Sequence, residues 1–128
     1  MNRVVLDASA VMTVINSEPG ADKLTAEILS TALTSTVNLA EVHGKLIQLG
    51  FSPDDAWAAA NGTIHDAVAF TTEHAKTAGD LVMQTRPLGL SLGDRACLGL
   101  AIALRAAVYT ADRSWKNLNV GVRIHVIR

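Results

Sequence analysis

The sequence Val4-Val5-Leu6-Asp7-Ala8-Ser9-Ala10 contains the first predicted strand and the start of the first predicted helix. Its β-branched start predicts a short buried strand over residues 3–6, and the apolar face that follows predicts a helix over residues 9–16. A strand that passes directly into a helix is the building unit of a parallel α/β sheet. Asp7 stands at the junction, where a buried carboxylate is costly unless something neutralises it. We therefore take Asp7 as a candidate functional residue.

The same alternation continues to the end of the chain. Further helices are predicted over residues 21–33, 38–49, 52–61, 72–84, 91–105 and 113–118, and further strands over residues 35–37, 67–70, 107–110 and 122–127. Strands that alternate with helices indicate a parallel sheet covered on both faces. With 128 residues, we expect one α/β domain over residues 1–128.

Composition narrows the class of protein. Apolar residues make up 49% of the chain, which is enough for a core, and the net charge is only −1. Cys97 is the single cysteine, so no internal disulfide forms, and its apolar neighbours predict a buried thiol. No signal peptide or apolar run long enough to span a bilayer is visible. We therefore expect a soluble cytoplasmic protein.

Charge is unevenly distributed along the chain. Residues 95–128 contain six of the 11 Lys and Arg residues, but only one of the 12 Asp and Glu residues, which is Asp112. A basic C-terminal quarter suits a polyanion bound beside an acidic metal site. Solvated surface arginines are the simpler explanation. Arg95 and Arg113 directly follow two of the acids, Asp94 and Asp112. Each arginine is expected to brace its acid, to contact phosphate or to point into solvent.

Four acids stand near the starts of predicted helices: Asp7, Glu41, Asp94 and Asp112. Strand-to-helix junctions of a parallel sheet meet at one edge, so these acids are expected to converge. An all-oxygen cluster suits Mg²⁺ or Mn²⁺.

Helix capping is the competing explanation of these acids. The pairs Asn38–Glu41 and Ser91–Asp94 both match a capping box, and Asp112 suits a simple helix cap. Capping explains each of these acids singly, but it does not explain why a strand end needs Asp7 as well.

Other polar and aromatic residues carry weaker signals. Ser9 and Thr110 stand two residues from Asp7 and Asp112, and they orient either metal-bound water or the local backbone. The four histidines have no paired metal-ligand spacing, and we expect them at the surface or its boundary: His43, His65, His74 and His125. Trp57 and Trp115 are expected as core anchors.

Several familiar sites are excluded. The sequence contains no glycine-rich dinucleotide fingerprint, no P-loop and no G-x-S-x-G nucleophile elbow. A signalling receiver domain would need an acid beside Asp7 and a lysine at the end of a late strand. Lys116 instead lies in a predicted helix.

Four segments together resemble the acidic motifs of the PIN domain. They are Val4–Ala10, Asn38–Val42, Leu90–Leu98 and Tyr109–Trp115, which contain the four acids in the family's order. The nearest likeness is to VapC-type toxins of bacterial toxin–antitoxin pairs.

The resemblance implies a three-layer α/β/α sandwich with a central parallel sheet. It implies an endoribonuclease that uses one or two Mg²⁺ or Mn²⁺ ions, forms a homodimer and is inhibited by a cognate antitoxin. By this resemblance Asp7, Glu41, Asp94 and Asp112 are the catalytic metal ligands, and Ser9 and Thr110 are supporting residues. The alternatives are a FitB-like protein that works with a DNA-binding partner, and a PIN module that binds RNA or a partner without catalysis.

The antitoxin is expected to dock on residues 8–33. This segment is rich in apolar residues, more of which are expected to face outward than one core stripe explains: Val11, Val14, Ile15, Leu24, Ile28 and Leu29.

Overall fold

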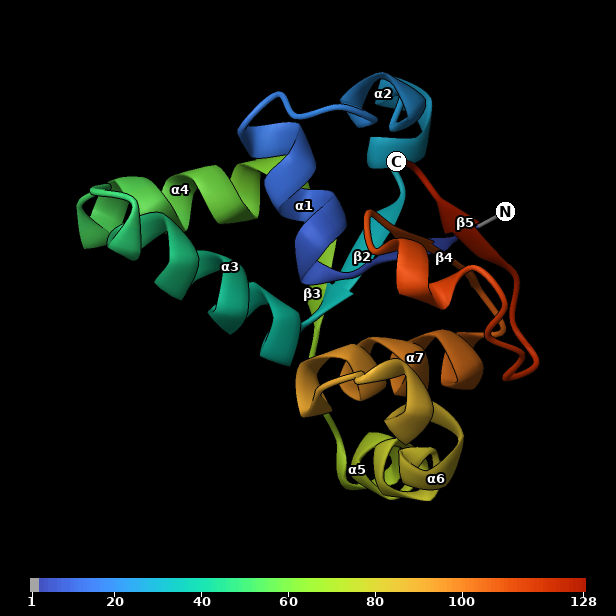
Figure 1. Cartoon of the computed structure of the whole chain (residues 1–128). Coiled ribbons are helices and arrows are strands. Elements are labelled where there is room, and N and C mark those ends of the chain that lie inside the picture. Colours follow the sequence, from blue (N-terminus) through green and yellow to red (C-terminus); the bar gives the residue numbers. More distant parts are fainter. Residues whose placement is uncertain (1–2) are drawn as a thin grey trace.

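The computed structural model describes residues 3–128 and contains a five-stranded sheet in the order β3-β2-β1-β4-β5. Every neighbouring pair of strands is parallel (Figure 1). The strands are β1 (Val4–Leu6), β2 (Ala32–Ser35), β3 (Asp66–Val68), β4 (Ala107–Thr110) and β5 (Ile124–Val126). The predicted parallel sheet is confirmed.

Helices cover both faces of this sheet, so the molecule is an α/β/α sandwich (Figure 1). One layer contains α1 (Ala8–Ile15), the 3₁₀ turn η1 (Ala21–Lys23), α2 (Ala26–Leu29), α3 (Thr36–Gln48) and α4 (Pro53–Thr63). The other layer contains α5 (Thr72–Asp80), α6 (Val82–Thr85), η2 (Arg86–Leu88), α7 (Leu92–Leu104) and η3 (Arg113–Trp115).

The core consists of two clusters, one on each face of the sheet. Successive side chains of a strand point to opposite faces, so Val4 and Leu6 join the cluster under α1 and α3, and Val5 joins the cluster under α7. Trp115 is fully buried in the second cluster, which confirms it as a core anchor. Cys97 is also fully buried, as predicted.

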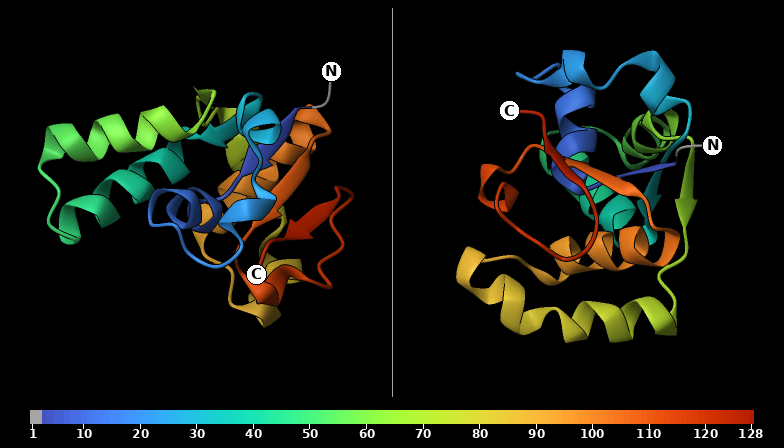
Figure 2. Two further views of the ribbon diagram at one scale, coloured as in Figure 1. Left: turned by 90° about the horizontal axis from the view of Figure 1, so that it is seen from above. Right: turned by 90° about the vertical axis from the view of Figure 1, so that its right-hand side faces the viewer.

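Trp57 was predicted as a core anchor, and this prediction is wrong. Its side chain is 50% exposed and contacts the ring of His43 edge-on, with the centroids 5.2 Å apart. The reason is the placement of α4, which extends with α3 away from the sheet as a helical hairpin (Figures 1 and 2). Only one face of α4 is therefore covered, through Ala56 and Ala60.

The predicted helix over residues 21–33 is also wrong. Thr25 caps a single α-helical turn, and residues 32–35 form β2 beside β1. Ser35 then caps α3, which starts at Thr36 and not at Asn38. Pairing with β1 outweighs the weak helical preference here, since the neighbouring strand buries Ala32 and Leu33.

Several other boundaries differ from the predicted ones. The helix predicted over residues 72–84 divides at Leu81 into α5 and α6, the helix over 113–118 shortens to η3, and the last strand covers three residues. No helix within residues 3–128 is long and apolar enough to cross a membrane.

The apolar residues of segment 8–33 do not form the outward surface that we expected. Val11 and Leu24 are buried, and Val14, Ile15, Ile28 and Leu29 pack partly buried against the same core. The most exposed large apolar side chains lie elsewhere: Met83 (65%), Leu49 (62%) and Leu92 (58%). These side chains therefore do not support antitoxin docking on residues 8–33.

Candidate active site

Asp7 follows β1 and is the N-cap of α1, and its side chain is only 3% exposed. Oδ1 accepts hydrogen bonds from the amide of Ala10 at 2.8 Å and from the hydroxyl of Ser9 at 2.7 Å. Burial raises the pKa of this carboxyl to about 6, because the hydrogen bonds to it offset only part of the desolvation. The negative charge of Asp94 adds a smaller rise to the pKa.

Thr110, at the end of β4, holds the other oxygen of Asp7. Its hydroxyl donates to Oδ2 at 2.6 Å and accepts the amide of Asp112 at 3.1 Å. The hydroxyl of Ser9 also contacts Asp7 Oδ2, at 2.9 Å, and it accepts the amide of Ala111, at 2.9 Å. Ser9 and Thr110 therefore link the ends of β1 and β4 around one carboxylate.

Glu41 lies in α3 against the first turn of α7. Asn38, one turn earlier on α3, donates through Nδ2 to Glu41 Oε1 at 2.8 Å and to the carbonyl of Gly93 at 2.9 Å. A Cβ placed on Gly93 would lie 2.5 Å from both Glu41 oxygens, so the Glu41 carboxylate keeps this position only beside a glycine. Asn38 is buried, and its Oδ1 accepts no hydrogen bond from residues 3–128.

The sequence did not predict the roles of Asn38 and Gly93. Asn38 was interpreted as the cap of a helix, but Ser35 is the cap and Asn38 orients Glu41 instead. No sequence pattern indicates that Gly93 is part of the site, apart from its position directly before Asp94.

Asp94 lies in the first turn of α7. The predicted capping box is present, with the amide of Ser91 donating to Asp94 Oδ2 at 2.8 Å and the amide of Asp94 donating to the Ser91 hydroxyl at 3.2 Å. One turn later, burial raises the pKa of the Cys97 thiol, and the negative charges of Asp7, Asp94 and Glu41 raise it further. The three carboxylates thus act electrostatically on the same buried thiol.

Asp112 stands beyond the end of β4 and is exposed. It is the N-cap of η3, where Oδ1 accepts the amide of Ser114 at 2.9 Å. Its link to the other acids runs through its own backbone amide and the Thr110 hydroxyl. Asp112 therefore caps η3 and is also linked to Asp7 through Thr110.

Each capping or orienting contact occupies only one carboxylate oxygen. Within residues 3–128, Glu41 Oε2, Asp94 Oδ1 and Asp112 Oδ2 have no hydrogen-bond partner. In this arrangement, no three His, Cys, Asp or Glu side chains of the described residues are grouped closely enough to hold a metal ion.

The histidines and arginines lie outside this set of contacts. His74 is buried, contrary to the expected surface position, whereas His125 is partly exposed and stacks on Tyr109. Arg95 donates to the carbonyl of Ala78 in α5 at 2.9 Å, so it neither braces an acid nor points into solvent. Arg113 is exposed beside Asp112.

The first turns of α1, α3 and α7 lie side by side at the carboxyl end of the sheet (Figure 1). This edge is where ligands bind in open parallel sheets. Asp7, Glu41, Asp94 and Asp112 come to this edge from four separate segments, and they offer oxygen ligands and no histidine.

Residues 4–120 match the PIN domain family. No curated protein is significantly similar in sequence. Solved structures with the same fold include a DNA-bound VapBC complex from Salmonella typhimurium, at 18% identity, with 100% of both chains covered and a TM-score of 0.74.

Two further structures share the fold. A VapC toxin from Mycobacterium tuberculosis, described as cleaving the sarcin–ricin loop, is 18% identical, with 94% of this chain and 98% of that chain covered and a TM-score of 0.73. The FitAcB structure from Neisseria gonorrhoeae is 15% identical, with 97% of each chain covered and a TM-score of 0.63. At these identities the likeness is one of fold.

Proposed function

Because this chain belongs to the PIN domain family, we propose that it is a metal-dependent endoribonuclease and the toxin of a toxin–antitoxin pair. The observation that carries the proposal is that Asp7, Glu41 and Asp94 lie at the ligand-binding edge of the sheet, with Asn38 joining Glu41 to Gly93, the residue before Asp94. A buried carboxylate with a raised pKa beside other acids is a common sign of a functional site.

The donor set fits a hard divalent cation, Mg²⁺ or Mn²⁺. Asp7, Glu41, Asp94 and Asp112 supply only oxygen, and the last three each keep one carboxylate oxygen free. We propose that these four acids hold one or two such ions. When bound, the metal lowers the pKa of water and neutralises charge on the phosphate.

The surrounding residues position the acids. Ser9 and Thr110 orient the Asp7 carboxylate and stabilise its charged form, since both donate to it. Asn38 orients Glu41 while leaving Oε2 free. The Asn38 contact to the Gly93 carbonyl also fixes α3 against α7, which sets the spacing between Glu41 and Asp94.

The partner that we propose is a cognate antitoxin, because VapBC complexes share this fold. A nuclease that degrades cellular RNA must be restrained until it is needed. We expect the protein to act in the cytoplasm as a homodimer. The alternatives are a FitB-like protein acting with a DNA-binding partner, which the FitAcB likeness keeps open, and a PIN module without catalysis.

The test is cleavage of total RNA by the purified chain, with Mg²⁺ or Mn²⁺ and with EDTA, beside the Asp7→Asn variant. We expect cleavage only with metal and only in the wild type. Co-expression with the neighbouring open reading frame should yield a co-purifying complex that does not cleave RNA. Absence of cleavage by a folded, metal-saturated protein would favour the non-catalytic alternative, and a partner that binds DNA while RNA stays intact would favour the FitB-like one.

A further inference from the structure

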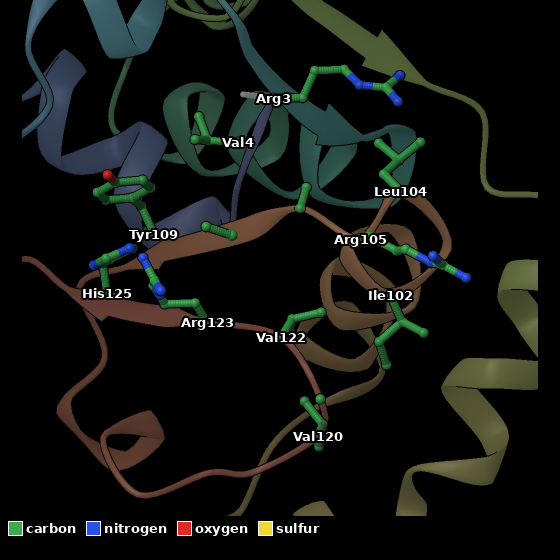
Figure 3. Close-up of a pocket in the computed structure, with 13 residues that line it drawn as sticks. Arg3, Val4, Ile102, Leu104, Arg105, Tyr109, Val120, Val122, Arg123 and His125 are labelled. Atoms are coloured by element: carbon green, nitrogen blue, oxygen red, sulfur yellow. The ribbon is translucent and has the colours of Figure 1, made fainter. Parts of the chain in front are cut away.

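A basic trough runs along the outer side of β4 and β5, apart from the acids. It consists of two cavities, of 930 Å³ (Figure 3) and 650 Å³, which share Tyr109 and His125. Arg3, Arg105 and Arg123 line the first cavity, and Lys23, Arg113, Lys116 and Arg128 line the second. No Asp or Glu of the described residues lines either cavity.

Arg128 pairs with Glu18, and the other six cations form no ion pair within residues 3–128, where the second salt bridge is Lys76–Asp80. Like charges gathered in a concave surface repel one another and raise the local positive potential. Because an anionic ligand relieves this repulsion, the trough suits a ligand with several negative charges. An extended polyanion fits best, since the charges are spread along the whole edge of the sheet.

An aromatic pair stands where the two cavities meet. The rings of Tyr109 and His125 stack with their centroids 4.7 Å apart and their planes at 21°. Both residues are partly exposed, and both line the cavities (Figure 3). Aromatic faces beside a line of cations are the pairing with which proteins bind single-stranded nucleic acid, through bases and phosphates respectively.

Arg105 gives an independent indication. It is the C-cap of α7 and has a left-handed backbone, with φ 52° and ψ 44°. Glycine is the usual residue at such a helix end, and a bulky side chain there is strained. Arg105 lines the first cavity beside Ile102 and Leu104, and its guanidinium extends away from Tyr109 and His125 (Figure 3). A strained residue that also supplies a charge to a cavity is a candidate ligand contact.

We propose that this trough binds a single-stranded segment of the RNA that the proposed nuclease cleaves. The phosphates contact Arg3, Arg105 and Arg123, and a base stacks on the Tyr109–His125 pair. The strand leaves the second cavity at Arg113, directly after Asp112, and so reaches the acids from the side of β4. This inference rests on the proposed function for the identity of the RNA.

The experiment measures the binding of a fluorescein-labelled oligoadenylate by fluorescence anisotropy in EDTA, at several salt concentrations. We expect Arg105→Gly and Arg123→Gln to weaken binding and each to reduce the salt slope by about 0.7 for the lost phosphate contact. His125→Ala should weaken binding roughly fivefold or more through the lost stacking. Arg105→Gly should not lower the melting temperature, since glycine relieves the backbone strain.

The matched control is Arg86→Gln, which removes one exposed guanidinium from η2, a segment that lines neither cavity. This variant should bind oligoadenylate like the wild type. Equal losses in Arg86→Gln and in the trough variants would overturn the proposal, as would unchanged binding in Arg105→Gly, Arg123→Gln and His125→Ala. Displacement of the RNA by polyglutamate as efficiently as by unlabelled oligoadenylate would also overturn it.

The two proposals fail in different ways. If the wild type cleaves RNA and Asp7→Asn does not, but the trough variants bind normally, then only the trough proposal fails. If no cleavage occurs, while the trough variants selectively lose oligoadenylate binding, then the nuclease proposal fails and the trough remains an RNA-binding surface.

Discussion

The hydroxyl of Thr110 donates a 2.6 Å hydrogen bond to Oδ2 of Asp7, across 103 positions of the sequence. The same hydroxyl accepts the amide of Asp112 at 3.1 Å. One side chain therefore connects two of the four candidate metal ligands and joins the ends of β1 and β4. The hydrogen bond also lowers the pKa of Asp7, against the larger rise that burial causes.

Thr110→Val is expected to abolish most RNA cleavage. Valine keeps the shape of threonine but leaves Asp7 without this donor and the Asp112 amide without its acceptor. Stability should fall by about 1–3 kcal/mol, which is typical when buried hydrogen-bonding groups lose a partner. Cleavage rates and urea denaturation measure the two effects.

The matched control is Thr34→Val. Thr34 is buried in β2, and its hydroxyl donates to the Leu6 carbonyl at 2.8 Å. This variant should lose a similar amount of stability and keep its activity at temperatures where it is folded. Equal loss of activity in both variants would mean that Thr110 acts through stability alone.

Asp7→Asn is expected to stabilise the metal-free protein at neutral pH while abolishing cleavage. The pKa of Asp7 is raised from 3.8 to about 6 in the folded state. The folded protein therefore binds the proton more tightly than the unfolded chain, and the free energy of unfolding falls as pH rises from about 4 to about 6. The full pKa difference corresponds to about 3 kcal/mol.

Urea denaturation in EDTA at a series of pH values checks this expectation. The stability of Asp7→Asn relative to wild type should increase between about pH 4 and pH 6 and then stay constant, because asparagine does not titrate. Asparagine is also a good N-cap, so α1 should remain capped. Parallel pH curves for the two proteins would show that Asp7 carries no such cost.

Gly93→Ala is expected to reduce activity through Glu41. The added Cβ would lie 2.5 Å from both Glu41 oxygens, so the carboxylate must move away from α7. The affinity for Mn²⁺, measured by calorimetry, should fall together with the cleavage rate. Gly44→Ala is the control: it lies in the same helix as Glu41, has open space at its Cβ, and should stabilise the protein by about 0.5–1 kcal/mol without loss of activity.

Asp94→Asn and Ser91→Ala separate the capping role of Asp94 from its proposed role as a ligand. An asparagine at position 94 still accepts the Ser91 amide, so we expect stability close to wild type but weaker Mn²⁺ binding and little cleavage. Ser91→Ala removes the cap and should cost about 1 kcal/mol while leaving Mn²⁺ affinity unchanged. The reverse pattern would mark Asp94 as a capping residue alone.

Local patterns in the sequence were sufficient for several elements. Three predictions depend on interactions between residues close in the chain or on the burial of apolar groups. They are the β-branched strand before Asp7, the capping box of Ser91 and Asp94, and the buried single cysteine. Such interactions depend on the residues present, whatever lies across the molecule. The parallel sheet followed from the alternation of these local elements.

Contacts between distant segments were decided only by the tertiary structure. Ser35, not Asn38, caps α3 because pairing with β3 extends β2 to Ser35, and this frees Asn38 to contact Glu41 and Gly93. The strand order β2-β1-β4 then determines which helix starts meet, and therefore which acids are neighbours. The four acids and their order can be read from the sequence alone. Their contacts depend on the packing of α3 against α7 and of β4 against β1, because these contacts join chain segments 55 and 103 positions apart.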